Sequence, residues 1–299
     1  MTIQRQQGGS QRDWNEVRNH STQPVITIIT STYNVVQDLQ WTIDSIREQT
    51  YPNIQWIIAD GASTDGTVEM LKEHSDLIDY WFSESDTGIY DAWNKALEHV
   101  TGDWVQFIGA GDELFETNTL EKVAYYLKDA YPEYELVYGQ VMHISEKGRK
   151  ELYVSGEPWE KYKGKWEIGR PKLPSHPAVY HHNSLFLNDK FNSDFKIVAD
   201  SLLLLNYINN PFLYIPIIID KMPNGGISSS PIGSVKCYEE LLKANKLLNI
   251  KVPYKVRVKS RLRYFFTKSS LFFLTEEQYG KFMDITKIIR RKPKVFTLE

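Results

Sequence analysis

The sequence predicts an α/β fold, in which a mixed, mostly parallel sheet of Rossmann-like type is flanked by helices. From Pro24 onward, short apolar runs alternate with longer segments whose apolar residues recur at helical spacing. The first run, VITIIT at 25–30, is apolar or β-branched throughout, as expected for a parallel strand buried on both faces. After residue 230 helical spacing dominates, so we expect a helical C-terminal extension beside the sheet.

The elements of the first half follow in a regular order. Leu39, Ile43 and Ile46 form one apolar stripe, which predicts the helix after the first strand. The pattern then predicts strands at 54–59, 78–83 and 104–108, and helices at 64–74 and 87–100.

In the helix predicted at 87–100, the apolar stripe leaves several polar side chains uncovered. They face either solvent or a ligand crevice, and they are Tyr90, Asp91, Asn94 and Lys95.

Composition and charge bound the function. The chain has 299 residues, of which 41% are hydrophobic, enough for a substantial core and about two domains. Residues 231–299 carry 16 Lys/Arg and 6 Asp/Glu, a net charge of +10, so the total of -3 leaves residues 1–230 at -13. The predicted site lies in the acidic part, whereas a nucleic-acid-binding face is basic, so we expect no nucleic-acid partner.

We divide the chain into three regions. Residues 1–22 are polar and lack the apolar core of a signal peptide, so we predict a disordered tail; 23–230 form the main α/β domain, and 231–299 the basic extension. Cys237 is the only cysteine, which excludes an internal disulfide and favours a cytoplasmic location. The longest apolar run, 212–219, contains a proline and is too short to span a membrane.

Polar residues follow each of the first four predicted strands. Because the carboxyl ends of parallel strands share one edge of an open sheet, these side chains should converge on a single crevice. They are Thr32, Tyr33 and Asn34 after the first strand, Asp60 after the second, Asp86 after the third and Asp112 after the fourth.

Each acid also has a purely structural alternative. The segment DGASTDGT at 60–67 supplies a tight turn and a helix cap, but Asp60 at the strand end is also placed to accept bonds from a base or ribose. Asp86 either caps the next helix, with Gly88 allowing the turn, or contacts a ligand. Asp112 is either a turn residue or a ligand for Mg²⁺ or Mn²⁺.

Asp200 precedes an apolar helical run in the second half. It is either a carboxylate favoured by the helix dipole or a general base whose pKa is raised by partial burial. The three histidines within 175–182 lack the spacing and partners of a zinc site.

Residues 25–115 resemble the N-terminal half of the family 2 glycosyltransferases, which have the GT-A fold. The resemblance thins between 116 and 230. The matching segments are VITIITSTYN, QTYPNIQWIIADGASTDGT and ESDTGIYDAWNKALEHVTGDWVQFIGAGDEL, and more loosely ADSLLLL and GGIS.

The resemblance implies an inverting hexosyltransferase that moves a sugar from a nucleotide-diphosphate sugar, preferably a UDP-sugar, to an acceptor hydroxyl. The nucleotide-sugar-binding half would be 23–115 and the acceptor half 116–230. Asp112 matches the acid that binds Mg²⁺ or Mn²⁺ on the donor diphosphate, and Asp200 matches the catalytic base. The donor-contacting positions are Thr32, Tyr33, Asn34, Asp60, Asp86, Gly88, Asn94 and Gly111.

This sequence departs from the family pattern at two places. Gly111 stands before Asp112, where the family often has a second acid, and Ala199 stands beside Asp200, where it often has another. The resemblance also implies a glycan or lipid-linked acceptor from surface polysaccharide or glycolipid synthesis.

Two other classes of function are alternatives to this one. A non-catalytic nucleotide-sugar-binding module would keep the pocket without turnover. A nucleotidyltransferase is disfavoured because the segment at 31–39 has neither glycine nor a basic residue for a phosphate loop. Residues 250–299 interleave cations with apolar residues, which fits either peripheral binding to an anionic inner membrane face or a solvated surface.

Overall fold

The computed structural model describes residues 5–10, 12–146, 148–226, 228 and 230–289. In the first half, the predicted alternation of strands and helices is confirmed to within a few residues. The elements are β2 (Ile26–Thr32), α2 (Val36–Arg47), β3 (Ile54–Asp60), α3 (Thr67–Glu73), β4 (Tyr80–Ser83), α4 (Ile89–Leu97), β5 (Trp104–Gly109), β6 (Glu113–Leu114) and α5 (Thr119–Leu127).

The second half adds further strands to the same sheet. Between these strands lie two α-helices, α6 and α7, and two short 3-10 helices, η1 and η2. The elements are β7 (Leu136–Ile144), β8 (Glu151–Ser155), α6 (Trp159–Tyr162), β9 (Trp166–Glu167), β10 (Arg170–Pro171), η1 (His176–Ala178), β11 (Val179–His182), η2 (Asn183–Leu187), α7 (Ala199–Asn206) and β12 (Phe212–Pro223).

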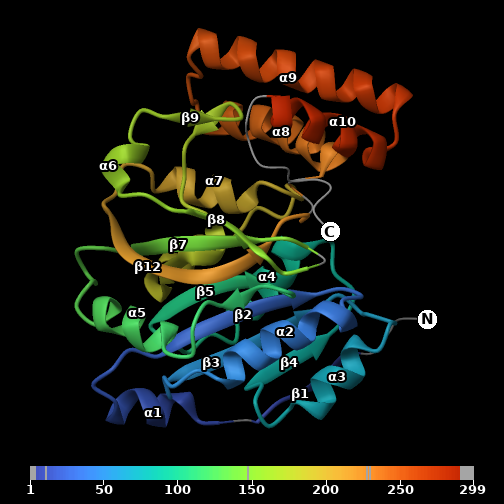
Figure 1. Ribbon diagram of the computed structural model, residues 1–299. Coiled ribbons are helices and arrows are strands. Elements are labelled where there is room, and N and C mark those ends of the chain that lie inside the picture. The colour runs from blue at the N-terminus through green and yellow to red at the C-terminus, as the bar shows by residue number, and fades with distance from the viewer. Residues whose placement is uncertain (1–4, 11, 147, 227, 229, 290–299) are drawn as a thin grey trace.

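One large sheet runs through the molecule (Figure 1). Starting from β1 (Gln6–Gly8), its strand order is β1-β4-β3-β2-β5-β11-β7-β12-β6, and β8 pairs with β7. The pairs β4-β3, β3-β2, β2-β5 and β7-β12 are parallel, whereas β11 is antiparallel to both β5 and β7 and so joins the two halves. The prediction of a mixed, mostly parallel sheet flanked by helices is therefore confirmed.

The register of the parallel strands positions the polar residues. Thr32 lies opposite Asp60, and Asp60 lies opposite Ser83, so three carboxyl ends form one row. Ser31 lies opposite Gly109 in the next strand, which places the turn before Asp112 at the same edge.

Helices cover both faces of the sheet. On one face, α2, α3 and α5 bury side chains such as Leu39, Leu71 and Val123 against the strands. On the other, α4, α7 and α8 do so, with Leu202 and Leu241 among the buried residues. Apolar burial on both faces accounts for the continuous hydrophobic runs of β2 and β3.

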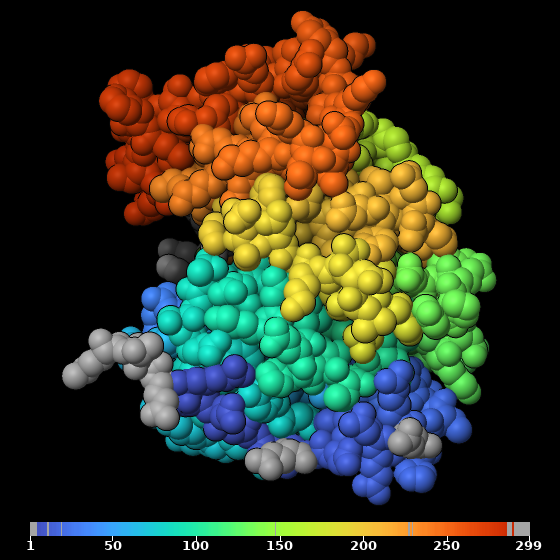
Figure 2. Space-filling view, turned by 180° about the vertical axis from the view of Figure 1, so that it is seen from behind, coloured from blue at the N-terminus to red at the C-terminus, as the bar shows by residue number. Residues whose placement is uncertain are grey.

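The C-terminal extension is helical, as predicted. Its described residues, 231–289, form α8 (Pro231–Leu247), α9 (Tyr254–Phe273) and α10 (Glu276–Ile289) at one end of the molecule (Figures 1 and 2), and 290–299 lie outside the described part. Helix α8 buries Tyr238, Leu241 and Ala244 and so ties the extension to the α/β domain. None of the helices in the described residues is both long and apolar enough to span a membrane.

The prediction of a disordered tail at 1–22 is wrong for the residues that are described. Residues Gln6–Gly8 form β1, which pairs with the edge strand β4, and Trp14–His20 form α1. Trp14 is buried and its indole N–H donates to Asp79 at 2.8 Å. The polar composition predicted disorder, but one buried tryptophan and pairing with an open sheet edge are enough to hold the segment in place. Residues 1–4 and 11 lie outside the described part.

Two histidines lie in the core between β5, η1 and β11. His176 stacks on Trp93 and Phe107, with ring centroids 5.4 and 5.5 Å apart, and its Nε2 has no hydrogen-bond partner among the described residues. Burial lowers the pKa of His176 to about 3 and also holds the pKa of His181 well below its usual range. Both rings are therefore neutral in the folded protein at neutral pH.

These buried rings should make the fold sensitive to acid. Below pH ~6.5 the unfolded chain takes up protons on His176 and His181, whereas the folded chain does not. The free energy of unfolding therefore decreases as the pH is lowered, by about 1 kcal/mol per histidine per pH unit. Urea unfolding of the wild type and His176→Leu at several pH values measures this. In the variant, the pH dependence that the two histidines give to the free energy of unfolding should be about halved. If the free energies of unfolding of wild type and variant differ by the same amount at pH 7 and at pH 5.5, the prediction is wrong.

Candidate active site

Asp60 is the centre of a buried hydrogen-bond network at the carboxyl edge of the sheet. Its carboxylate accepts the hydroxyls of Thr32 at 2.8 Å, Ser63 at 2.5 Å and Ser83 at 2.7 Å. It also accepts the Ser63 backbone N–H at 2.9 Å. One carboxylate thus joins the ends of three strands and the loop that follows β3.

A second set of bonds locks that loop to the end of β2. Asn34 has a positive φ of 52° and donates its backbone N–H to the Ser63 hydroxyl, while its side-chain oxygen accepts the Thr64 N–H at 2.9 Å. Asp65 accepts the N–H groups of Val36 and Thr67 at 3.0 Å each. The two loops therefore form one rigid ledge above the strand ends.

Tyr33, Gly61 and Asp86 meet on this ledge. A Cβ at Gly61 would lie 2.7 Å from the Asp86 carboxylate and 3.2 Å from the Tyr33 ring, so any larger residue there would have to displace these side chains. Tyr33 is 66% exposed, and Asp86 accepts the Gly88 N–H at 2.8 Å. An exposed aromatic ring beside a carboxylate is suited to contacting a base and a ribose.

The turn between β5 and β6 holds Asp112. The Gly109 N–H donates to the Asp112 carboxylate at 2.8 Å, and Thr42 of α2 donates its hydroxyl to the Asp112 carbonyl at 2.7 Å. Gly111 has a φ of 97°, a backbone conformation that favours glycine, and its N–H donates to the Thr42 hydroxyl. The other Asp112 carboxylate oxygen accepts no hydrogen bond from the described residues.

Arg149 clamps this turn from the β7–β8 hairpin. Its guanidinium donates to the Gly111 carbonyl at 2.8 Å, pairs with Glu113 and lies 4.6 Å from the centre of the Trp41 ring. Sequence reasoning missed Arg149 because it is one of several cations in the short polar segment 146–150, with no motif around it.

Burial of Asp112 favours its neutral form. Burial raises the pKa of Asp112 to about 7, although the Gly109 N–H and Arg149 lower it. A buried acid with one free oxygen is stabilised in its ionised form by a cation. Among the described residues, no group of three or more His, Cys, Asp and Glu side chains forms a complete metal site. A divalent ion on Asp112 would therefore take its other ligands from elsewhere, as Mg²⁺ does from water and phosphate.

Asp200 stands in the first turn of α7. One of its oxygens accepts the Ser201 N–H at 2.6 Å and the Tyr90 hydroxyl at 3.1 Å, while the other accepts no bond from the described residues. Burial raises the pKa of Asp200, and Ser201, Arg170 and Tyr90 lower it in part. An acid with a raised pKa and a free oxygen is suited to accept a proton.

Tyr90 was expected on the uncovered side of α4, facing solvent or a crevice, but it is buried. The segment 191–198 folds over this side, stacks Phe191 on the Tyr90 ring at 5.7 Å and takes the Tyr90 hydroxyl on the Ile197 carbonyl. Periodicity within α4 could not anticipate cover from a segment about 100 residues away.

Asn94 and Lys196 fix the same segment. Both ends of the Asn94 amide bond the Phe191 backbone, at 2.7 and 2.9 Å, so this side chain positions the approach to Asp200. Lys196 donates its ammonium to the Thr87 carbonyl at 2.7 Å and lies against Gly88. Lys196 was not predicted, because nothing in the sequence connects it to the loop before α4.

The family of the chain follows from comparison with known proteins. The sequence model of the family described as Glycosyl transferase family 2 matches residues 27–195, more than half of the chain. The chain belongs to glycosyl transferase family 2. A PGL/p-HBAD biosynthesis glycosyltransferase from Mycobacterium bovis (strain BCG / Pasteur 1173P2) is 28% identical over 218 residues, 69% of this chain and 80% of the relative.

Solved structures confirm the GT-A fold. The mannosyltransferase PcManGT from Pyrobaculum calidifontis, in complex with GDP-Man and Mn²⁺, matches with a TM-score of 0.56 and 20% identity over 85% of this chain and 71% of that one. S. aureus TarS 1-349 in complex with UDP matches with a TM-score of 0.54 and 14% identity over 87% of this chain and 78% of that one. At these identities the likeness concerns the fold.

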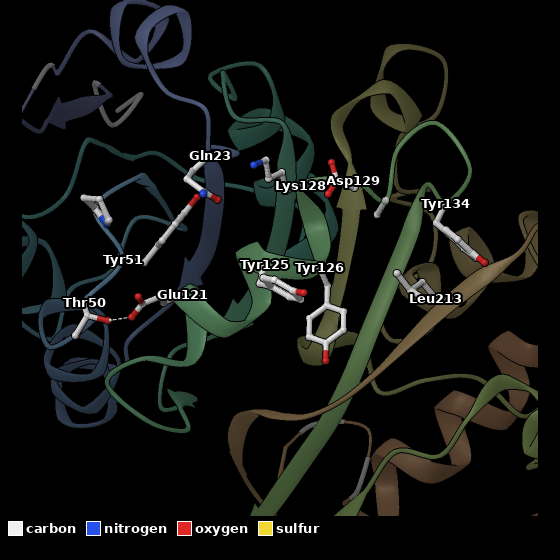
Figure 3. Close-up of a pocket in the computed structure, with 12 residues that line it drawn as sticks. Gln23, Thr50, Tyr51, Glu121, Tyr125, Tyr126, Lys128, Asp129, Tyr134 and Leu213 are labelled. Atoms are coloured by element: carbon white, nitrogen blue, oxygen red, sulfur yellow. Dashed lines mark hydrogen bonds between the residues drawn. The ribbon is translucent and has the colours of Figure 1, made fainter.

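A hollow of about 710 Å³ lies elsewhere on this glycosyltransferase (Figure 3). It is lined by residues that precede β2 and β3, such as Gln23 and Pro52, and by Tyr125 and Glu121 of α5. Within this lining the Thr50 hydroxyl donates to the Glu121 carboxylate at 3.0 Å. Gln23 and Pro52 precede their strands, whereas the acids of the candidate site follow theirs. The hollow therefore lies at the opposite edge of the sheet and is not part of the candidate site.

Replacing Asp60 should loosen the site. In Asp60→Asn an amide N–H would face hydroxyl and N–H donors, so we expect a loss of about 2 kcal/mol in the free energy of unfolding. Chemical denaturation measures it. The control is Asp44→Asn, whose carboxylate is 48% exposed in a surface pair with Arg47 and should matter little. Equal destabilisation by both changes would show that the Asp60 network does not organise the ledge.

Proposed function

We propose that this family 2 glycosyltransferase moves a hexose, with inversion, from a nucleotide-diphosphate sugar to an acceptor hydroxyl of a surface glycan or glycolipid. The observation that carries the proposal is the convergence of the Tyr33–Asp86 ledge and Asp112 at one sheet edge, with Asp200 joined to α4 through Tyr90. The relative from Mycobacterium bovis is named for PGL/p-HBAD biosynthesis, which supports a role in glycan biosynthesis.

The donor would lie across the ledge. Tyr33 and Asp86 would contact the nucleoside, and Thr32, Asn34 and Asp60 would hold the loops that present them. Asp60 would accept a bond from the base only by giving up one of its four present donors. Among the solved structures, TarS carries UDP and PcManGT carries GDP-Man, so we propose a UDP-sugar donor and test GDP-sugars beside it.

The diphosphate end would lie at the Gly109–Asp112 turn. Bare backbone at Gly109 and Gly111 permits close approach of a phosphate, and Asp112 would hold Mg²⁺ or Mn²⁺ there. When bound, such an ion neutralises the charge that develops on the departing diphosphate. Gly88 and Asn94 would act through the loop and the segment that they fix.

Asp200 would act as the general base. The free oxygen of Asp200 would take the proton of the acceptor hydroxyl. As it does so, the acceptor oxygen would attack the anomeric carbon of the donor sugar from the face opposite the diphosphate. Tyr90, which donates to the other oxygen, would orient the carboxylate. A single displacement of this kind forms one C–O bond, breaks the bond to the diphosphate and inverts the anomeric centre.

Asp200→Asn should remove the base while keeping the shape of the site. We expect transfer to fall by about 100-fold or more, because general-base catalysis contributes 10²–10⁴-fold. Nucleoside-diphosphate release from UDP- and GDP-sugars over an acceptor panel measures transfer, and calorimetry measures donor binding. Donor binding should stay within a few fold of the wild type. Full transfer activity in Asp200→Asn would refute the assigned base.

If the wild type binds a donor but transfers no sugar to any acceptor in the panel, the chain would instead be a nucleotide-sugar-binding module.

Asn94→Ala, which frees the Phe191 backbone, should lower transfer more than donor binding, because it disturbs the Asp200 side alone.

We further propose that α9 rests on an anionic membrane surface, as suits a lipid-linked acceptor. At 100° per residue its exposed apolar side chains fall within one arc of the helix, opposite the buried Thr267. In the ribbon view α9 is the outermost helix of the extension (Figure 1). The stripe consists of Tyr254, Val258, Leu262, Phe265, Phe266, Phe272 and Phe273.

Cations border this stripe. Arg257 lies 5.7 Å from the Tyr254 ring centre and Arg261 lies 5.6 Å from that of Phe265, so charge and apolar surface are interleaved. A helix with aromatic residues on one arc and basic residues beside it binds in the plane of an anionic interface.

Membrane binding should depend on the stripe. Phe265→Ser with Phe272→Ser should reduce co-sedimentation with vesicles of phosphatidylcholine and phosphatidylglycerol by about tenfold or more. The matched control is Leu187→Ser, which removes an apolar side chain that is 80% exposed but lies outside α9. Equal binding by the two variants, or no binding by the wild type, would refute the membrane proposal.

A further inference from the structure

Asp220 in β12 is a buried acid that the site described above does not use. Its side chain is 0% exposed, and neither of its carboxylate oxygens has a hydrogen-bond partner among the described residues. The nearby Tyr180 hydroxyl is also buried and has no partner. Because burying an unpaired ionised carboxylate costs several kcal/mol, a carboxylate in this state requires either a proton or a cation.

A β-bulge in β12 determines the face of the sheet on which the Asp220 side chain lies. Ile218 lies opposite Gln140 of β7 and Asp220 lies opposite Val141, so one extra residue, Ile219, is inserted in β12. Such a bulge changes the face on which the following side chains lie. Asp220 therefore shares a face with its cross-strand neighbours Val141 and Leu114, which are buried in the core beneath α2 and α5.

The same strand pairing brings Asp220 beside Asp112. Asp220 lies opposite Leu114, two residues after Asp112; burial raises the pKa of Asp220 well above its usual value, and the nearby Asp112 raises it further. Arg149 is the cation that acts on both, but it already pairs with Glu113. Two buried acids thus share one cation whose charge a third acid balances.

We propose that Asp220 is a second protein carboxylate for the divalent cation at Asp112. This inference rests on the metal site of the proposed function and adds a residue to it. A divalent cation would balance both charges, and carboxylate oxygens are the ligands that Mg²⁺ and Mn²⁺ prefer. Asp220 would then supply, from β12, the acid that Gly111 leaves out of the turn.

The test measures Mn²⁺ binding to the full chain by electron paramagnetic resonance of the free ion, alone and with UDP or GDP added. Asp220→Asn should weaken Mn²⁺ binding about tenfold or more, and Asp112→Asn should do the same. The double variant should lose little beyond either single change, because both groups bind one ion. Asp44→Asn, an exposed acid on α2, should bind Mn²⁺ as the wild type does.

Thermal unfolding gives a second readout that does not depend on activity. Mn²⁺ should raise the unfolding temperature of the wild type but not that of Asp220→Asn. Without Mn²⁺ the variant should unfold at the same temperature or higher, because an amide does not repel Asp112. If circular dichroism shows that Asp220→Asn is unfolded, Asp220→Ser takes its place with the same expectation.

The outcomes separate this inference from the proposed function. Wild-type Mn²⁺ affinity in Asp220→Asn, with binding lost in Asp112→Asn, would overturn the role of Asp220 and leave Asp112 as the metal ligand. No Mn²⁺ binding by the wild type under any of these conditions would overturn both metal assignments. Glycosyl transfer would still be judged by Asp200→Asn, which does not involve the ion.

Discussion

The architecture of the site depends on the Asp60 carboxylate. Strand register brings Thr32, Asp60 and Ser83 into one row, and Asp60 then bonds its neighbours and the Ser63 loop. Charge-assisted bonds in a buried setting are strong and directional, so this row sets the height of the ledge on which Tyr33 and Asp86 meet. The bonds of Asn34 and Asp65 then join the loops that follow β2 and β3.

Much of this was accessible from the sequence. The β-branched run of β2, the helical stripe of α2 and the acids after each strand predicted the sheet, its carboxyl edge and the residues gathered there. These features succeed because each is local: a buried parallel strand needs an apolar run, and the next turn needs Gly, Asp or Ser. The resemblance of residues 25–115 to family 2 glycosyltransferases adds roles for those acids, of which the structure shows the placement.

What sequence reasoning missed depends on contacts between distant segments. Tyr90 is buried because 191–198 folds over α4, and Arg149 reaches the Gly111 turn from a hairpin nearly 40 residues later. The orientation of Asp220 follows from a bulge in β12, which no alternation pattern reveals. Trp14 and β1 anchor a segment whose polar composition predicted disorder. In each case a single side chain or an inserted residue, rather than a pattern, decides the structure.

The central claim is that the donor binds at the carboxyl edge of the sheet and not in the hollow at its amino edge. Hydrogen–deuterium exchange with and without UDP- and GDP-sugars in Mn²⁺ tests it directly. We expect a donor to slow exchange in the loops at 61–66, 85–88 and 109–113, where the ledge and the Asp112 turn lie. Slowed exchange confined to 121–134, which borders the hollow of Figure 3, would contradict the account.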